Sequence, residues 1–298
     1  MYDLIIIGGG PAGITAAAMA LNHRLETLII AERWGGQTTY AMQLEDMEEQ
    51  QDVTGQTLLD SFRRQLDYLD FVRLFDRVVR VVPMDPNFIV DTAKGDRFEG
   101  RALIIATGAK PQVLDIPGEA RLAGRGLSYS AAIHSSLFLG KGVAVVGDAL
   151  CAQCMAVDLA RKAYWTYLVA PGKLPDSPLT ERLRQMDNLE ILEDAMPKEI
   201  QGDQFVNGIV IVTNSGQERN IPVQGVFVKR PRIPNSGLVK EWVDCDQNGH
   251  ILVDVHCATN LPGVFAAGDV THVSEQMLVH IGEGAKAAES AYRYLLRC

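Results

Sequence analysis

The sequence predicts an α/β protein of two Rossmann-like, doubly wound domains, the second inserted in the first. A Gly-rich dinucleotide fingerprint stands between a predicted strand and a predicted helix near the N-terminus, and a degraded copy of the pattern recurs at 147–152. The chain of 298 residues is also long for a single hydrophobic core. These three observations together favour two domains of the same kind.

The first fingerprint follows a continuous apolar run at 4–7, which is typical of a parallel strand buried on both faces. A helix of small residues is expected at 14–21. In the G-x-G-x-x-G pattern, Gly8 makes the tight turn, Gly10 lets the backbone approach a pyrophosphate and Gly13 lets the helix pack close to the strand. The stretch therefore predicts a dinucleotide phosphate at the N-terminus of this helix.

A second apolar strand is expected at 27–30, and Glu32 follows it, nineteen residues beyond Gly13. A carboxylate at this place suits a ribose 2′-hydroxyl and repels a 2′-phosphate. Trp34, in the next loop, has two equally weighted interpretations: it stacks on a flat ring, or it covers the loop.

Farther along, apolar spacing predicts a helix at 57–71, and alternating apolar residues with turn signals predict strands at 78–82 and 88–92. Another buried strand, at 101–105, runs into the residues Ala-Thr-Gly-Ala at 106–109.

Composition excludes several classes of protein. A net charge of −9 argues against a nucleic-acid partner. No apolar run reaches the length of a membrane span, and the N-terminus enters a strand at once, so we expect a cytoplasmic protein without a signal peptide. Five cysteines are too few for a disulfide scaffold, and a C-x-x-C pair in a reducing compartment is typically redox-active or metal-binding.

The motifs GGGPAG, GGQ, ATG and GVFAAGD together resemble the FAD-dependent pyridine-nucleotide disulfide reductases, specifically the low-molecular-weight thioredoxin reductase group. The resemblance covers essentially the whole chain and implies FAD and a homodimer. It implies that Gly268 and Asp269 hold the ribityl and phosphate region, and that Gln276 meets the flavin ring. The other residues implied to lie against FAD are Gly8, Gly10, Pro11, Ala12, Gly13, Glu32, Gly36, Gln37, Thr107 and Gly108.

The same resemblance divides the chain. The FAD-binding domain is expected to be discontinuous, with residues 1–113 and 244–298, and the central domain to comprise residues 114–243. In thioredoxin reductases the central domain binds NADPH through a second fingerprint. Here that stretch reads GDALCA at 147–152, in which Asp148 adds a negative charge and Ala149 adds a Cβ where backbone should approach phosphate. The family's basic cluster falls on VAPG at 169–172, without a positive charge, so we expect no NADPH binding there.

The family's redox disulfide is also missing. Its two cysteines and following acid correspond to Ser130, Ile133 and His134. Neither serine nor isoleucine forms a disulfide. His134 is interpreted either as a proton carrier or, preferentially, as a structural histidine.

A different C-x-x-C, formed by Cys151 and Cys154, lies inside the degraded fingerprint and in the first turn of the predicted helix, where partial positive charge favours a thiolate. We interpret it as redox-active; the alternative is two helix cysteines packed as small apolar groups. Zinc would need two further ligands that the neighbouring sequence does not offer. Being nearer the helix start, Cys151 is predicted to attack a partner, with Cys154 as the resolving thiol.

Lost NADPH motifs together with a relocated C-x-x-C resemble one branch of the family, the diflavin-linked disulfide oxidoreductases of cyanobacteria. This resemblance implies two FAD molecules per chain and electron flow from thiols to flavin. The basic run at 229–232 is a candidate phosphate clamp for the second FAD, or else a solvated turn. The partner is expected to be an unidentified dithiol or disulfide protein or a small thiol, and membrane association stays open.

Two other functions remain as alternatives. One is a thioredoxin reductase fed by a ferredoxin-type donor, against which the missing cysteines at 130 and 133 count. The other is a protein that binds flavin without turnover.

Overall fold

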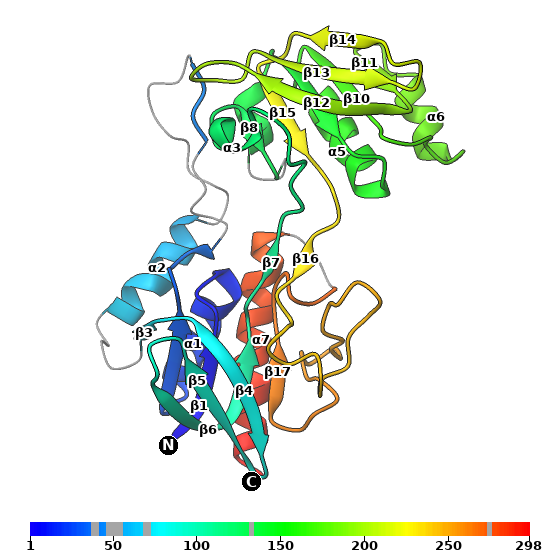
Figure 1. Cartoon of the computed structure of the whole chain (residues 1–298). Coiled ribbons are helices and arrows are strands. Elements are labelled where there is room, and N and C mark those ends of the chain that lie inside the picture. The colour runs from blue at the N-terminus through cyan, green and yellow to red at the C-terminus, as the bar shows by residue number, and fades with distance from the viewer. Residues whose placement is uncertain (37–41, 46–55, 68–72, 131–133, 273–275) are drawn as a thin grey trace. The chain divides into compact units, whose positions relative to one another are not determined.

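The computed structural model describes residues 1–36, 42–45, 56–67, 73–130, 134–272 and 276–298 (Figure 1). The chain divides into two compact units, each described by itself. Unit 1 comprises Met1–Thr39, Thr54–Lys110 and Arg232–Cys298, and unit 2 comprises Tyr40–Val53 and Pro111–Pro231.

Unit 1 is built on a sheet with strand order β3-β2-β1-β6-β5-β4, in which β17 also pairs with β6. The pairs among β1, β2, β3, β6 and β17 are parallel, whereas β4 and β5 continue the sheet antiparallel. In chain order the elements are β1 (Tyr2–Ile7), α1 (Pro11–Asn22), β2 (Thr27–Ala31), α2 (Gln56–Asp67), β3 (Arg73–Phe75), β4 (Val78–Met84), β5 (Asn87–Thr92), β6 (Arg97–Ile105), β7 (Ala109–Lys110), β16 (Ile233–Pro234), β17 (Val264–Ala266) and α7 (Met277–Leu295).

The segment β1-α1-β2 confirms the strand, helix and strand that the fingerprint and its flanking residues predict. Alanines and glycines let α1 lie close to α7: a Cβ on Gly284 would overlap the backbone of Ala12. The predicted strand at 101–105 is the end of the longer strand β6. Of the helix predicted at 57–71, α2 covers the part up to Asp67, and 68–72 lie outside the described residues.

Unit 2 contains a parallel sheet with the order β11-β10-β9-β15-β8 and a separate antiparallel sheet, β12-β13-β14. Its elements are α3 (Glu119–Leu122), β8 (Leu127–Ser128), the 3₁₀ helix η3 (Ser135–Phe138), β9 (Gly142–Val146), α5 (Leu150–Ala160), β10 (Trp165–Val169), α6 (Pro178–Arg184), β11 (Leu189–Leu192), β12 (Ala195–Gln201), β13 (Gly208–Thr213), β14 (Glu218–Ile221) and β15 (Gly225–Val228). Both units therefore have the α/β Rossmann type of architecture.

The second division between the units comes at Pro231, ahead of the boundary expected at 243. Strand β16 pairs with β7 of unit 1, and Val239 and Val243 are buried in the core of that unit. The segment between the two positions lacks a long apolar run, so its packing against the first domain had no signal in the sequence. Met42 and Leu44, by contrast, are buried in the core of unit 2.

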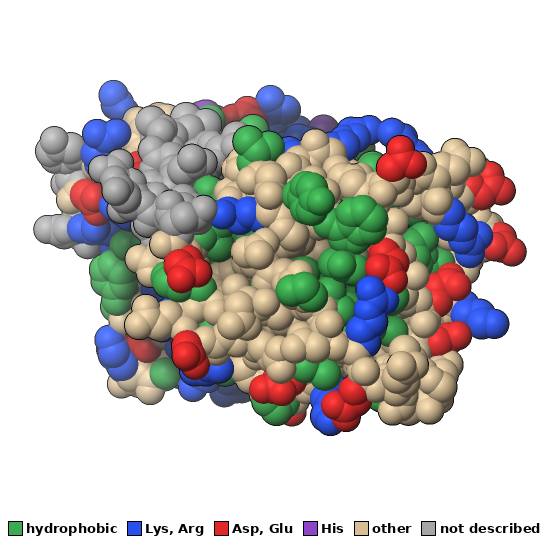
Figure 2. Space-filling view, turned by 90° about the horizontal axis from the view of Figure 1, so that it is seen from above, with side chains coloured by type: hydrophobic (Ala, Val, Ile, Leu, Met, Phe, Trp, Pro, Cys, Tyr) green, Lys and Arg blue, Asp and Glu red, His purple; other side chains and the backbone are tan. Residues whose placement is uncertain are grey.

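Charged side chains of both signs are interspersed on the face shown in Figure 2, with hydrophobic side chains between them. In unit 2, Arg219 pairs with Glu190 at 2.6 Å, and Lys198 pairs with Glu218. Within the described part of the chain, every helix is too short or too polar to cross a membrane.

Candidate functional site

The turn between β1 and α1 depends on its glycines. Gly8 has a φ of +120°, and a Cβ there would overlap the Ala106 carbonyl. A Cβ on Gly13 would overlap the Gly8 carbonyl, so glycine is what lets α1 start this close to the turn. Beside Gly10, no described atom lies within 4 Å of the position of a Cβ. Gly10 therefore borders open space at the end of β1.

The N-terminus of α1 faces this space without a cap. Gly10 is the N-cap residue, Pro11 occupies the first turn, and no described side chain caps the helix. The uncapped amides and the helix dipole favour an anion here, and the adjacent Ala12 is small and buried. Glu32, just after β2, is 65% exposed and 3.9 Å from Arg77 Nε. Its exposed carboxylate can accept from ribose hydroxyls.

Trp34 covers the loop after β2. Its ring meets Phe75 edge to face with centroids 5.4 Å apart, and a Cβ on Gly9 would lie 2.9 Å from Trp34 Cε3. These contacts favour the loop-covering interpretation over stacking on a ligand. Gly36 follows with a φ of +55°, and Gln37 lies outside the described residues.

Asn235 clamps the turn after β6, and sequence reasoning missed it. Its Nδ2 donates to the Thr107 carbonyl at 2.9 Å, and Thr107 Oγ1 donates to the Asn235 carbonyl at 2.9 Å. The Asn235 amide donates to the Gly108 carbonyl, also at 2.9 Å. Gly108, with a φ of +68°, again borders open space among the described atoms. The only sequence signal for Asn235 was the motif PNSG at 234–237, which lies in the segment predicted to belong to the central domain.

Asp269 lies in a charged cluster after β17. Its Oδ2 accepts from Arg232 Nη1 at 2.6 Å, and its Oδ1 is 3.2 Å from His280 Nε2. The three side chains are between 9% and 12% exposed. Arg232 and His280 hold the Asp269 carboxylate in place. Neither contact with Asp269 was predicted, and the one with Arg232 joins residues that are 37 positions apart in the sequence.

Glu283 on α7 supports the same loop. Its Oε2 accepts from the Gly268 amide at 2.8 Å, and the side chain is 6% exposed. Burial raises the pKa of Glu283 above its ordinary value. Gln276 is the N-cap residue of α7, which no described side chain caps. The helix dipole places positive partial charge at the start of α7.

All these groups lie at one edge of the sheet. The turns that carry Gly10, Glu32, Thr107 and Asp269 follow β1, β2, β6 and β17, whose pairings are parallel. Carboxyl ends of parallel strands are where doubly wound sheets bind ligands. Open space at Gly10, an uncapped helix start and an exposed carboxylate on the next strand fit a dinucleotide such as FAD.

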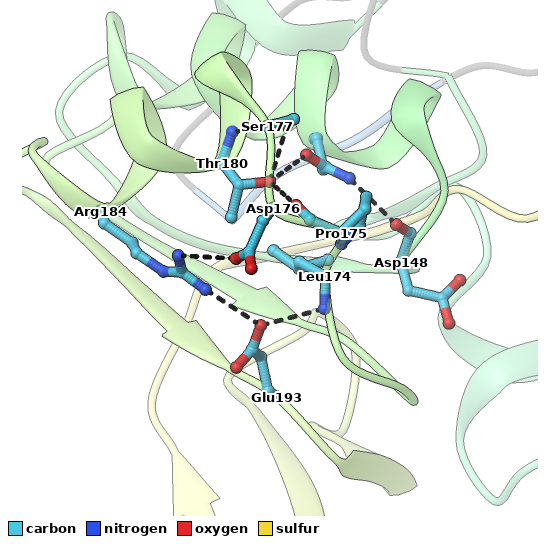
Figure 3. A network of polar contacts seen from close by, with 9 residues as sticks. Asp148, Leu174, Pro175, Asp176, Ser177, Thr180, Arg184 and Glu193 are labelled. Atoms are coloured by element: carbon cyan, nitrogen blue, oxygen red, sulfur yellow. Dashed lines mark hydrogen bonds and ion pairs between the residues drawn. The ribbon is translucent and has the colours of Figure 1, made fainter.

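In unit 2, the corresponding turn is altered. Gly147 keeps a φ of +149°, and a Cβ there would overlap the Lys229 carbonyl. The Asp148 carboxylate extends toward the loop after β10, where its Oδ2 would be 3.3 Å from a Cβ on Gly172. Figure 3 shows this side chain pointing away from the polar contacts beside it. A negative charge thus lies between the loop after β9 and the loop after β10.

Cys151 and Cys154 both belong to the start of α5. Ala149 is its N-cap residue, and no side chain in the described residues caps the helix. Cys151 is half-buried and Cys154 exposed, and both are free thiols. At a spacing of three on a helix the two side chains are neighbours. Helix position favours a thiolate at Cys151, whereas exposure makes Cys154 the more accessible sulfur.

The segment that carries the redox cysteines in thioredoxin reductases is different here. His134 is buried, and its Nδ1 lies 2.8 Å from Ser128 Oγ. Ser128 Oγ also accepts from the Ser130 amide at 3.0 Å. This arrangement favours the structural interpretation of His134; Ile133 lies outside the described residues.

The basic run at 229–232 does not form one surface. Lys229 is buried, and Arg230 Nη1 donates to the Val113 carbonyl at 2.9 Å within unit 2. Arg232 belongs to unit 1 and pairs with Asp269. The run is therefore not simply a solvated turn, and its role as a phosphate clamp stays a prediction.

Two of the other cysteines, Cys245 and Cys257, are poor candidates for thiol chemistry, whereas Cys298 is exposed. Burial raises the pKa of Cys257 to about 11, and its Sγ donates to the Glu283 carbonyl at 3.7 Å. Burial also raises the pKa of Cys245. Among the described residues, no group of three or more His, Cys, Asp or Glu side chains is arranged to hold a metal ion.

Comparison with known proteins identifies the family of this chain. Residues 2–290 match the family model of pyridine nucleotide-disulphide oxidoreductases. The chain is 34% identical to an NADH dehydrogenase of Bacillus subtilis over 301 residues, covering 99% of this chain and 59% of that protein. It is also 34% identical to an alkyl hydroperoxide reductase subunit of Pseudomonas aeruginosa, covering 99% and 58%. The chain thus spans about three fifths of the length of these relatives.

Among solved structures, thioredoxin reductase from Streptococcus pyogenes matches with a TM-score of 0.86 and 30% identity, covering 100% of this chain and 99% of that one. A ferredoxin-flavin thioredoxin reductase from Clostridium acetobutylicum matches with a TM-score of 0.51 and 28% identity, covering 99% and 98%. The fold is that of thioredoxin reductase, and the chain belongs to the pyridine nucleotide-disulphide oxidoreductase family.

Proposed function

We propose that this protein is a flavin-linked dithiol:disulfide oxidoreductase that works without NADPH and exchanges electrons through Cys151 and Cys154. The observation that carries the proposal is the loop after β9. In one stretch it has a carboxylate beside Gly172 and places Cys151 in the first turn of α5 and Cys154 one turn later. The changes that disfavour a phosphate thus coincide with the appearance of a dithiol.

The flavin would be FAD, held by unit 1. Gly10 and the start of α1 would receive its pyrophosphate, Glu32 its ribose, and Asp269 its ribityl and phosphate region. Bound FAD supplies a two-electron acceptor. The uncapped N-terminus of α7 at Gln276 would stabilise negative charge on the reduced ring.

The Cys151–Cys154 pair would exchange electrons with a partner in two thiol–disulfide steps. A partner thiolate attacks the Cys151 sulfur, the Cys151–Cys154 bond breaks, and Cys154 leaves as a thiolate. A second partner thiolate then breaks the mixed disulfide, so the partner is oxidised by two electrons and the pair is reduced. Bound FAD would accept the two electrons of the reduced pair, so that the internal disulfide forms again. In the opposite direction, Cys151 attacks a partner disulfide and Cys154 resolves the same mixed disulfide.

The direction from thiol to flavin, a content of two FAD per chain and a homodimeric assembly come from the resemblance to the diflavin branch. The substrate would be a dithiol or disulfide protein or a small thiol. The count of two flavins rests on this resemblance alone.

A second candidate is a reductase fed by a ferredoxin-type donor, because one structural relative is a ferredoxin-flavin thioredoxin reductase. Against it stand Ser130 and Ile133, which cannot form the family's disulfide. The third candidate, a protein that binds flavin without turnover, leaves the C-x-x-C without a use.

Serine replacement of each cysteine tests the proposal. Cys151→Ser and Cys154→Ser should keep FAD, since the fingerprint lies in unit 1, but lose flavin reduction by a dithiol in anaerobic stopped-flow measurements. Cys245→Ser is the matched control and should reduce its flavin at the native rate. Native kinetics in the Cys154→Ser protein would show that the pair is a bystander.

A further inference from the structure

A polar side chain is buried between the two cysteines of the C-x-x-C. Gln153 is 1% exposed, whereas its neighbour Cys154 is exposed. The other buried positions of α5 are apolar, among them Ala152, Met155 and Ala156. An amide buried in such surroundings destabilises the fold unless both its ends are hydrogen-bonded.

The Gln153 amide links the turn before α5 to α6, and Figure 3 labels its two partners, Asp148 and Thr180. Its Nε2 donates to the Asp148 carbonyl at 3.2 Å, and its Oε1 lies 3.1 Å from Thr180 Oγ1 as acceptor. Thr180 is fully buried on α6, and the one proton of its Oγ1 is shared between Gln153 Oε1 and the Pro175 carbonyl, which is 2.7 Å away. The Thr180 amide in turn donates to Ser177 Oγ, the cap of α6, at 3.2 Å.

The carbonyl that Gln153 holds belongs to the turn ahead of α5. Asp148 immediately precedes the N-cap residue, Ala149, whose carbonyl accepts the first helical bonds from Ala152 and Gln153 at 2.9 and 3.2 Å. Alanine has no side chain that could cap the turn. Gln153 fastens it instead, from the buried side, to the start of α6.

We propose that Gln153 is a positioning residue for the Cys151–Cys154 pair: by fixing the Asp148 carbonyl against Thr180, it keeps the first turn of α5 helical, so that the helix dipole stabilises a thiolate at Cys151. The inference rests on the proposed function only in assigning redox chemistry to these cysteines. The dipole acts within the first turn, so loosening that turn weakens its effect on the sulfur.

The effect is measurable in a balanced exchange, in which the two thiols and glutathione disulfide give the Cys151–Cys154 disulfide and two glutathione molecules. Weaker stabilisation of the thiolate disfavours the reduced form. Loss of the Gln153 contacts should therefore raise the equilibrium constant for oxidation about five-fold, and lower the rate of alkylation by iodoacetamide at pH 6.5 by a similar factor.

The variants are Gln153→Leu and Thr180→Val, each compared with the full-length parent for its alkylation rate as a function of pH and its equilibrium with glutathione. We expect each variant to lower the alkylation rate and to raise the equilibrium constant for oxidation. The double variant should show no larger change, because both substitutions break the same chain of contacts. Thr180→Ser keeps the hydroxyl and should match the parent. Val157→Ala, which loses buried packing on the same helix, should lower stability without moving either thiol measurement.

If Gln153→Leu or Thr180→Val folds with a native circular dichroism spectrum and leaves both measurements unchanged, the inference is wrong. Both measurements are made anaerobically and read the thiols rather than the flavin absorbance, so the result is distinguishable from the test of the proposed function. A shifted thiol equilibrium alongside native flavin kinetics in the cysteine variants would support the positioning role and refute the redox link to flavin.

Discussion

At the scale of single residues, exposure and helix position single out different cysteines. Cys151 lies nearer the start of α5, and Cys154 is more exposed. We predict that Cys154→Ser accumulates a mixed disulfide with an oxidised partner, because Cys151 attacks and nothing resolves the adduct. Mass spectrometry after incubation with an oxidised dithiol protein measures it. An adduct trapped only in Cys151→Ser would assign the attack to Cys154.

Two glycines of the fingerprint should behave differently. A Cβ on Gly13 overlaps the Gly8 carbonyl, whereas a Cβ on Gly10 meets no described atom. Gly10→Ala should fold with stability within about 1 kcal/mol of the parent but lose FAD affinity by at least about ten-fold, because the methyl group occupies the approach to pyrophosphate. Gly13→Ala should fail to fold stably.

Denaturant melts and flavin titration check both variants. If Gly10→Ala kept native FAD affinity, the cofactor would not approach the chain at this turn.

Glu283 gives a prediction with a definite sign. Burial raises its pKa above the ordinary 4.5, so the folded protein keeps this proton at pH values where the unfolded chain has lost it. The stabilisation is complete below pH 4.5 and disappears as pH rises through the folded pKa. Glu283→Gln can still accept from the Gly268 amide, and it should therefore flatten the fall in unfolding free energy on the alkaline side of that range.

Urea unfolding at a series of pH values measures this slope. The parent and variant having the same slope would mean that Glu283 is ionised in the folded protein.

At the scale of elements, the approach of α7 to α1 holds the cofactor edge together. Gly284→Ala would force a Cβ into the Ala12 backbone, so we expect a loss of about 2 kcal/mol or more in unfolding free energy and weaker FAD binding. Gly282→Ala, on the same helix, meets no described atom and should stabilise by up to about 1 kcal/mol. Equal melting temperatures for the two variants would contradict this packing.

The elements that could be predicted are those with local signals. The strand, turn and helix at 2–22 follow from apolar runs and glycine spacing. The contacts of Arg232, Asn235 and Glu283 could not be predicted, because they join separate segments of the chain. Asn235, for example, contacts Thr107 across 128 positions. The inward direction of Gln153 was equally hidden, since helical spacing alone does not rank a glutamine among core positions.

At the scale of the whole molecule, two units of similar architecture carry different candidate functional residues. Unit 1 keeps the features that fit a dinucleotide, and unit 2 replaces them with a dithiol. We predict about two FAD per chain in the purified protein, on the resemblance to the diflavin branch. Extraction and quantitation, with added FAD to fill any empty site, measure the ratio. A ratio of one under these conditions would leave the FAD of unit 1 as the sole flavin.

The most direct test of the central claim is an anaerobic titration of the flavin absorbance, comparing NADPH and NADH with a dithiol. The loop at 147–152 carries Asp148, and the loop at 169–172 carries no basic residue, so neither nucleotide should reduce the flavin appreciably, whereas the dithiol should bleach it. Rapid stoichiometric bleaching by either nucleotide would contradict the account.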